Sequence, residues 1–319
     1  MNPETTSDPF RALIRAEGVR LYRDLPWRDT RDPYAIWISE VMLQQTQVPR
    51  VLTRWGAWLE RFPSVGALAE APVADVLEAW QGMGYNRRAL ALKQAAQIIM
   101  REHGGAFPRE APELTALPGI GPATAQGIRS FAFNLPGVYL ETNVRTVFLH
   151  HFFPDADSVP DRDLVPLVRA ACPAAPDAVL ATDEDGVTAG FAEPADERDT
   201  PRAWYYALLD YGAELKKTVP NPSRRSSGYT RQSRFEGSRR QKRAAIVRML
   251  LEAQKAGSVL TLEEARERLS GLEQKAGRAP VDGTLVRSIL SDLVREGFCV
   301  DVTASGVGGE GPIAGWQVP

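Results

Sequence analysis

The spacing of apolar and polar positions predicts helices along the first two-thirds of the chain. In residues 86–103 (NRRALALKQAAQIIMREH) apolar side chains recur every three or four positions, which puts them on one helical face, and Gly104 offers a C-cap. Asp32 followed by Pro33 has the form of an N-cap and a first-turn proline, so a helix is expected over 33–48. Strand signals are few here, and we predict an all-α region whose other helices cover 49–62, 73–83, 113–116, 122–133, 142–153 and 200–217.

The pattern changes near residue 240. Helical spacing recurs in three short segments, 242–257, 261–271 and 282–297, and two strand-like segments follow at 298–303 and 312–318. Three helices and a terminal hairpin are typical of a winged helix, which binds DNA in some proteins and other proteins elsewhere. We therefore predict a mostly α protein with the following parts: a helical domain over 1–222, an acidic insertion within it at about 172–200, a basic linker over 223–239 and a winged-helix-like domain over 240–319.

Charge is segregated along the chain although the net charge is only −2. Residues 177–199 are acidic, with Arg198 as the single base, whereas residues 223–248 carry many arginines and lysines against one glutamate. We call residues 223–248 the basic strip. Such a strip suits the phosphates of a nucleic acid, and a solvated linker is the alternative interpretation.

Composition narrows the class of protein. With 44% hydrophobic residues the chain of 319 residues has enough apolar material for a core, yet no apolar run approaches the 18 residues of a membrane span. The N-terminus MNPETTSDPF has no signal-peptide pattern. Cys172 and Cys299 lie far apart, which argues against a disulfide framework or a thiolate metal site. We expect a cytoplasmic monomer that binds no metal and no membrane.

The stretch ALPGIGPATAQGIRSFAF, which begins at Ala116, places a tight turn between two helical segments. Gly119 and Gly121 are expected to adopt positive φ, so that successive N–H groups converge beside the N-terminus of the helix at Pro122. That geometry suits a phosphate group. Glycine turns between packed helices are also common without any ligand.

Four motifs occur in order and carry a resemblance: LPWRDTRDPYAIWISEVMLQQTQV, GMGYNRRALALKQAA, LPGIGPATA and LETNVRTV. Together they resemble the helix–hairpin–helix DNA glycosylases, specifically the MutY-like adenine glycosylases and, more distantly, endonuclease III. The resemblance covers residues 20 to 220, and ISEVMLQQTQV is its most specific part. It implies a helix–hairpin–helix glycosylase fold and base-excision repair of double-stranded DNA that contains a mismatch or lesion.

The resemblance assigns the catalytic residues. Glu40 matches the acid that protonates the leaving purine, and a half-buried carboxyl with a raised pKa would suit that task. Glu141 stands where the family has an aspartate that stabilises the sugar cation, and the extra methylene alters the geometry. Asn143 matches a family active-site asparagine. The alternatives are a surface Glu40 paired with arginine and a Glu141 that only caps a helix.

The remaining site residues also come from the resemblance. Ala123 stands where lyase-competent relatives carry a Schiff-base lysine, so a monofunctional glycosylase is expected. Tyr85 matches a residue that wedges into the duplex, although a core position would also explain it. The full set expected to contact DNA or the flipped base is Trp27, Arg28, Leu43, Gln44, Gln45, Tyr85, Arg87, Arg88, Gly119, Ile120 and Gly121.

Two departures from the family leave the substrate open. The stretch after residue 215 has none of the four cysteines that hold an iron–sulfur cluster in relatives, so no cluster and no other cofactor are expected. Residues 240–319 are too short and too helical for the Nudix-like domain of adenine glycosylases. Adenine opposite 8-oxoguanine or guanine is the first expectation. The alternatives are another damaged or deaminated base, a non-catalytic protein that binds damaged DNA, and a helical protein-interaction module.

Overall fold

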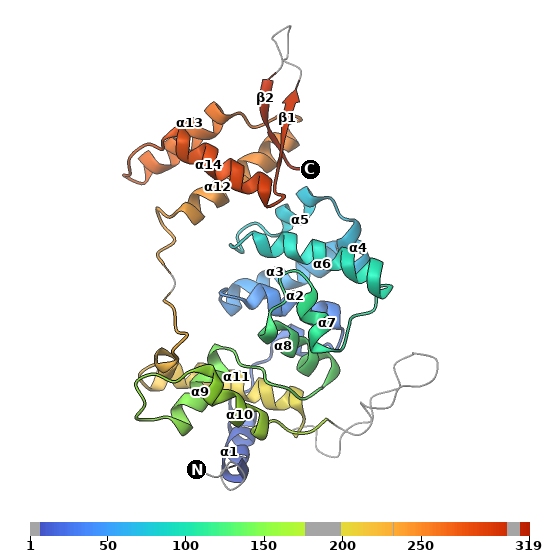
Figure 1. The fold of residues 1–319 in the computed structure, drawn as a ribbon, viewed down its shortest axis with the longest axis vertical. Coiled ribbons are helices and arrows are strands. Elements are labelled where there is room, and N and C mark those ends of the chain that lie inside the picture. Colours follow the sequence, from blue (N-terminus) through green and yellow to red (C-terminus); the bar gives the residue numbers. More distant parts are fainter. Residues whose placement is uncertain (1–6, 176–198, 232, 305–312) are drawn as a thin grey trace. The chain divides into compact units, whose positions relative to one another are not determined.

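The computed structural model describes residues 7–175, 199–231, 233–304 and 313–319, and is mostly helical there (Figure 1). Contacts between Cα atoms divide the chain into two compact units, Met1–Trp55 with Ala106–Arg231 and Gly56–Gly105 with Gln232–Pro319. The helix α3 (Val48–Arg61) has residues in both. Most of the predicted acidic insertion lies outside the described residues. No helix in the described ranges is long and apolar enough to cross a membrane.

Among the residues that the structure describes, the first unit consists of helices and connecting turns, with one isolated β-bridge between Val159 and Ser226. Its elements are α1 (Ser7–Arg20), the 3-10 turn η1 (Pro26–Arg28), α2 (Pro33–Leu43), α7 (Ala111–Ala116), α8 (Pro122–Phe133), α9 (Thr142–Phe152), α10 (Asp161–Ala171), α11 (Pro201–Thr218) and η3 (Pro222–Arg225).

Helix α2 lies at the centre of the first unit. Asp32 caps it by accepting a hydrogen bond from the Tyr34 N–H, and Pro33 fills the first turn, as predicted. Eight of its eleven residues are buried, which is the pattern of a helix enclosed on all sides. It ends at Leu43, earlier than predicted, because Gln44 leaves the helical conformation and Gln45 has φ +54°. Helix α2 packs on α8, and α11 packs on both α1 and α9.

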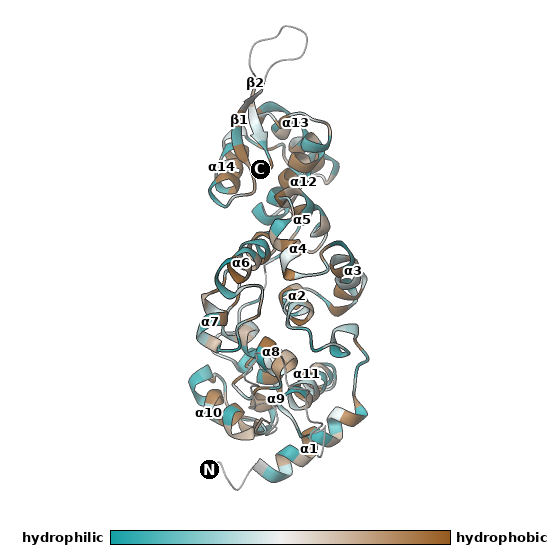
Figure 2. Cartoon of the chain, turned by 90° about the vertical axis from the view of Figure 1, so that its right-hand side faces the viewer, coloured by the Kyte–Doolittle hydropathy of each residue, from teal (hydrophilic) through white to brown (hydrophobic). Residues whose placement is uncertain are grey.

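The second unit combines α4 (Val65–Glu70), α5 (Val73–Ala79) and α6 (Arg87–His103) with α12 (Arg239–Lys255), α13 (Leu262–Lys275), α14 (Gly283–Arg295), β1 (Val300–Ala304) and β2 (Ile313–Gln317). The strands pair antiparallel, with Val300 opposite Gln317, and Leu260 adds a bridge to Trp316. Figure 2 shows hydrophobic and hydrophilic residues side by side on α14, whose buried Val286, Ile289 and Leu293 follow helical spacing.

The division into units differs from the expected one. Residues 56–105 were expected within the N-terminal domain, whereas their contacts group them with the C-terminal helices. Ion pairs explain part of this grouping, because Arg87 of α6 pairs with Glu296 and Glu78 of α5 pairs with Lys255. The three C-terminal helices and the hairpin lie where the sequence predicts them. Helices α1, α4 and α10 were not predicted.

Candidate active site

A cavity of about 670 Å³ in the first unit brings together most of the predicted site residues. Its walls come from η1, the end of α2, the turn before α8, and the segment that leads into α9. Ten of the fourteen predicted residues line it: Trp27, Arg28, Glu40, Leu43, Gln44, Gln45, Gly119, Gly121, Glu141 and Asn143. The cavity thus has two carboxylates, three amides and aromatic walls, the groups that a nucleobase and its sugar would need.

Glu40 lies in the last turn of α2, and few polar contacts offset the cost of burying its carboxyl. Its Oε2 accepts a hydrogen bond from the Tyr139 hydroxyl at 3.0 Å. A Cβ atom on Gly127 of α8 would overlap this same oxygen, so the glycine makes room for the acid. Burial raises the pKa of Glu40 to about 8; the negative charge of Glu141 adds to the rise, and the Tyr139 hydrogen bond opposes it.

Glu141 is the N-cap of α9 and also lines the cavity. Its carboxylate accepts hydrogen bonds from the N–H groups of Asn143 and Val144. Burial raises its pKa, while these backbone bonds and the Lys216 ammonium work in the opposite direction. The capping role considered as an alternative is therefore present in the structure, and the same carboxylate still faces the cavity. Its part in the chemistry stays a prediction.

Asn143 presents an unused acceptor to the cavity. Its Oδ1 is buried and has no hydrogen-bond partner within the part of the chain that the structure describes. Helix α11 approaches its backbone so closely that a Cβ atom on Gly212 would overlap the Asn143 carbonyl oxygen. This close packing fixes the start of α9, and a buried acceptor without a partner favours a ligand that donates a hydrogen bond.

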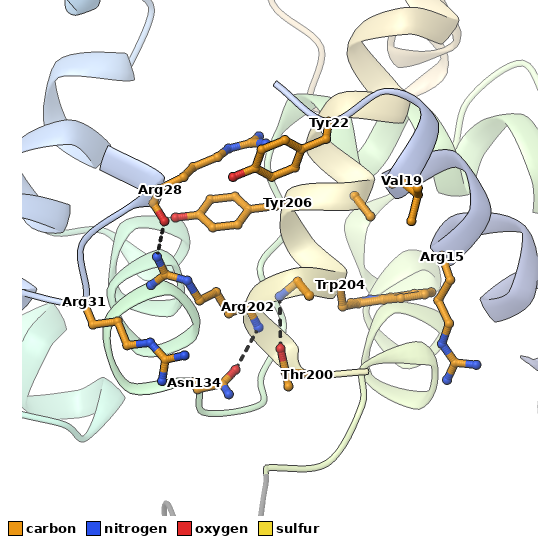
Figure 3. A pocket seen from close by; sticks show the side chains of 13 residues that line it. Arg15, Val19, Tyr22, Arg28, Arg31, Asn134, Thr200, Arg202, Trp204 and Tyr206 are labelled. Atoms are coloured by element: carbon orange, nitrogen blue, oxygen red, sulfur yellow. Dashed lines mark hydrogen bonds between the residues drawn. The ribbon is translucent and has the colours of Figure 1, made fainter. Parts of the chain in front are cut away.

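Arg28 forms a fixed wall rather than a free cation. Its guanidinium donates two hydrogen bonds of 2.8 Å to Asp210 and lies 4.3 Å from the centre of the Tyr206 ring. Arg202 donates to the Arg28 carbonyl at 2.7 Å (Figure 3). Arg28 and Tyr206 also line a second cavity, of about 460 Å³, so they separate two hollows in the same unit.

Three residues at this site were missed by sequence reasoning: Tyr139, Tyr206 and Asp210. Tyr139 carried a usable signal, because it precedes Glu141 by two positions and alternate residues of an extended segment share a side. Asp210 and Tyr206 carried none, since their partner Arg28 is more than 170 residues away in the sequence.

The glycine turn agrees with the prediction at one glycine only. Gly119 has φ +77°, but Gly121 has φ −87° and serves as the N-cap of α8, because an extended N-cap suits the first helical bond. No atom lies within 4 Å of a Cβ built on Gly121, so internal packing does not require glycine there. Ile120, predicted to contact DNA, has a buried side chain, and its N–H bonds to the Leu117 carbonyl at 3.2 Å.

Residues after α2 show backbone strain beside the cavity. Gln44 donates from Nε2 to the Thr124 hydroxyl at 3.0 Å. Gln45 is exposed and holds φ +54°, a left-handed conformation that costs free energy for a residue other than glycine. Strain of this kind collects at functional sites. Ala123 lines the cavity with a methyl group and offers no amine.

Tyr85, Arg87 and Arg88 belong to the second unit. Arg87 and Arg88 were expected to contact phosphates, but both are engaged within that unit, because Arg87 donates to Glu296 at 2.7 Å and Arg88 to the carbonyl oxygens of Met83 and Gly84. Tyr85 holds φ +48° and accepts a hydrogen bond from Arg240.

The basic strip is less free than its sequence indicates. Arg239 pairs with Asp292, Lys242 with Glu273, and Arg243 with Glu296. Arg225 instead donates to the carbonyl oxygen of Leu149 at 3.0 Å and holds η3 against the end of α9. Much of the positive charge is thus balanced inside the protein. Among the residues that the structure describes, no group of three or more His, Cys, Asp or Glu residues is placed to hold a metal ion.

Comparison with known proteins identifies the family to which this chain belongs. The model of the family described as HhH-GPD superfamily base excision DNA repair protein matches residues 38–165. An adenine DNA glycosylase of Mycobacterium tuberculosis (strain ATCC 25618 / H37Rv) is 37% identical over 246 residues, which are 74% of this chain and 76% of that protein. One from Buchnera aphidicola subsp. Baizongia pistaciae is 39% identical over 130 residues, covering 41% of this chain and only 37% of the relative.

The solved structure of a thermostable thymine-DNA glycosylase superposes with a TM-score of 0.52 at 21% identity, over 66% of this chain and 87% of the other. At this identity the likeness establishes the fold alone. The similarity to the Mycobacterium protein extends over about three-quarters of both chains. The chain therefore belongs to the HhH-GPD superfamily of base excision DNA repair proteins and, within it, to the adenine DNA glycosylases.

Proposed function

We propose that this chain hydrolyses the N-glycosidic bond of an adenine that is flipped out of duplex DNA from a position opposite 8-oxoguanine or guanine. One observation carries the proposal: the Glu40 carboxyl lines a cavity of about 670 Å³, large enough to admit a base, and burial raises its pKa to about 8. It is therefore protonated at neutral pH. A general acid in that state donates a proton to a leaving purine without any metal or covalent intermediate.

The other groups divide the remaining work. As the base leaves, positive charge develops on the sugar, and a carboxylate close by stabilises it. Glu141 supplies that carboxylate, held in place by the two N–H groups at the start of α9. Water then adds to the sugar cation, and the proton that the water loses passes to the Glu40 carboxylate, which the first step left ionised. Because Ala123 provides no amine, no imine forms and the product is an intact strand with an abasic site.

DNA binding follows from the backbone beside the cavity. Gly119, Gly121 and the N-terminus of α8 present N–H groups to a phosphate of the lesion strand. Gln45 of the first unit and Tyr85 of the second, both in left-handed conformations, are each expected to contact the duplex. The substrate is double-stranded DNA, the protein acts as a monomer, and the reaction takes place in the cytoplasm, at the nucleoid in a bacterium.

The test is a panel of labelled duplexes. It contains adenine opposite 8-oxoguanine, guanine, cytosine and thymine, together with hypoxanthine, uracil and thymine in mismatches. Each duplex is incubated with enzyme and then treated with alkali, which breaks the strand only where a base has been removed. We expect breaks at adenine opposite 8-oxoguanine and guanine. Breaks at another base would change the substrate, and binding without breaks on any duplex would favour a non-catalytic protein.

A further inference from the structure

Tyr85 is held by a residue of the C-terminal helices. Its hydroxyl accepts a hydrogen bond from Nη1 of Arg240 at 2.6 Å, and the Arg240 guanidinium lies 5.0 Å from the centre of its ring. The Arg88 guanidinium lies 5.6 Å from the same ring. Two cations thus contact one half-exposed aromatic side chain.

The turn between α5 and α6, which carries Tyr85, has three residues with positive φ. Gly82 and Gly84 have φ +84° and +71°, and Tyr85 itself has φ +48°. A bulky residue stays in the left-handed region only when its surroundings hold it there. The Arg240 contacts provide that restraint, since a hydrogen bond to the hydroxyl and a stacked guanidinium fix both the tip and the face of the ring.

Arg240 is itself anchored. It donates to the Ser233 carbonyl at 3.1 Å, and its guanidinium lies 5.4 Å from the centre of the Phe235 ring. Helix α12 is tied to the same region, because Glu296 accepts hydrogen bonds from both Arg87 of α6 and Arg243 of α12. The turn between α5 and α6 and the start of α12 are therefore joined by several polar contacts within the second unit.

We propose that Arg240 is a positioning residue for Tyr85, and that the C-terminal helices thereby set how well the enzyme distinguishes a lesion from undamaged DNA. The inference rests on the proposed function, in which Tyr85 contacts the duplex. A ring in a fixed orientation inserts where stacking is already weakened, at a mispair or lesion, and is excluded from a well-stacked matched step. A ring that is free to turn loses this preference.

The test compares the dissociation constants for two duplexes, adenine opposite 8-oxoguanine and adenine opposite thymine, by fluorescence anisotropy. Glu40→Gln serves as the background so that no turnover disturbs binding. Arg240→Ala is expected to lower the ratio of matched to lesion dissociation constants about tenfold, the combined worth of one hydrogen bond and one cation–π contact. Tyr85→Phe lowers it less, and the double variant does no more than Arg240→Ala alone.

Arg239→Ala is the matched control. It removes the same charge from the neighbouring position of α12, where the partner is Asp292 rather than Tyr85, so any change in affinity is equal for both duplexes and the ratio holds. Arg240→Lys, which keeps the charge without the planar stacking, gives an intermediate ratio and serves if the alanine variant fails to fold.

A ratio unchanged in Arg240→Ala or Arg240→Lys would overturn the inference, as would an equal drop in Arg239→Ala. If the unmodified protein removes no base from any duplex, the proposed function fails on its own, and the binding ratio still reports on Arg240.

Discussion

Two glutamates, one in each unit, show how environment decides what a buried carboxylate does. Glu40 accepts a hydrogen bond from a phenol, and burial raises its pKa to about 8. Glu273 of α13 is only 4% exposed but accepts hydrogen bonds from Arg278 at 2.7 Å and Lys242 at 3.0 Å, which lower its pKa to about 2. Glu273, which has cationic partners, stays ionised and links its helix to neighbouring residues. Glu40 has none of these partners in the hydrogen bonds described above, so it keeps its proton and can act as an acid.

The largest effect is expected from removing the acid. Glu40→Gln keeps the shape of the side chain but cannot protonate a leaving base, so base release should fall about 1000-fold, within the range attributed to general acids. Single-turnover assays with alkali treatment measure the rate, and anisotropy on the same duplex should show that binding survives. A variant with full activity would contradict the assignment of Glu40.

The next largest effect comes from the glycine opposite the acid. In Gly127→Ala the new methyl group would overlap Oε2 of Glu40 and displace the carboxyl, and a misplacement of about 1 Å costs roughly 100-fold in rate. Gly56→Ala is a control, because no atom lies within 4 Å of its Cβ position. Equal rates for Gly127→Ala and the unmodified protein would mean that the position of Glu40 is not critical.

The protonation state of Glu40 sets how the rate of base release depends on pH. The rate should fall about tenfold for each pH unit above about 8 as the Glu40 carboxyl ionises, and it should also decline at the acidic end, where Glu141, whose pKa is raised by burial, takes up a proton and loses its charge. The measurement is a single-turnover profile from pH 5 to pH 9.5 on one duplex. A decline centred near pH 4.5 would show an ordinary carboxyl and remove the basis for proton donation by Glu40.

The two glutamates should change the stability of the fold in opposite directions as the pH rises. Because its folded pKa is raised, Glu40 weakens the fold as pH rises from about 4.5 through 8, so Glu40→Gln should raise the melting temperature more at pH 8 than at pH 5. Glu273 has a lowered pKa, so its stabilisation is present above pH 4.5 and lost as pH falls towards 2. The measurement is thermal unfolding of Glu40→Gln and Glu273→Gln across this pH range, and pH effects of the same sign in the two variants would refute the contrast.

The smallest effects are expected on the free energy of unfolding, where loss of the buried ion pairs of Glu273 is compared with loss of the exposed pair of Glu263 and Arg266. Glu273→Gln leaves Lys242 and Arg278 without their carboxylate and should cost about 2 kcal/mol at pH 7. Glu263→Gln breaks an exposed pair with Arg266 on the same helix and should leave the melting temperature unchanged. Calorimetry at one pH compares them. A larger loss in Glu263→Gln would show that burial does not set the worth of these pairs.

Local sequence was a good guide to helices whose caps and apolar faces agree. It predicted α2 from Asp32 and Pro33, and α6 from its spacing and Gly104. It missed α10, which contains Pro166 in its interior, a residue that argues against a helix. It missed α1 as well.

Ten of the fourteen predicted site residues line one cavity. They could be predicted together because the four motifs, taken in order, resemble a known family in which these distant segments form one site. The partners beyond the motifs did not emerge from sequence. Tyr139 meets Glu40 across 99 positions and Arg240 meets Tyr85 across 155, and nothing in the local pattern of either residue encodes such a pairing. The grouping of residues 56–105 with the C-terminal helices was missed for the same reason, since it rests on contacts between distant segments.

The capping role of Glu141 has a consequence for which residues position 141 tolerates. Its carboxylate both closes the first turn of α9 and faces the cavity. Serine or asparagine would preserve the turn and discard the negative charge, whereas a lengthened or relocated acid would keep the charge and loosen the turn. Aspartate is the one replacement that meets both demands, and it does so by drawing the charge back towards the backbone. The cap of α9 thus limits position 141 to glutamate or aspartate. The side chains of these two residues differ in length, so they place the negative charge at different depths in the cavity.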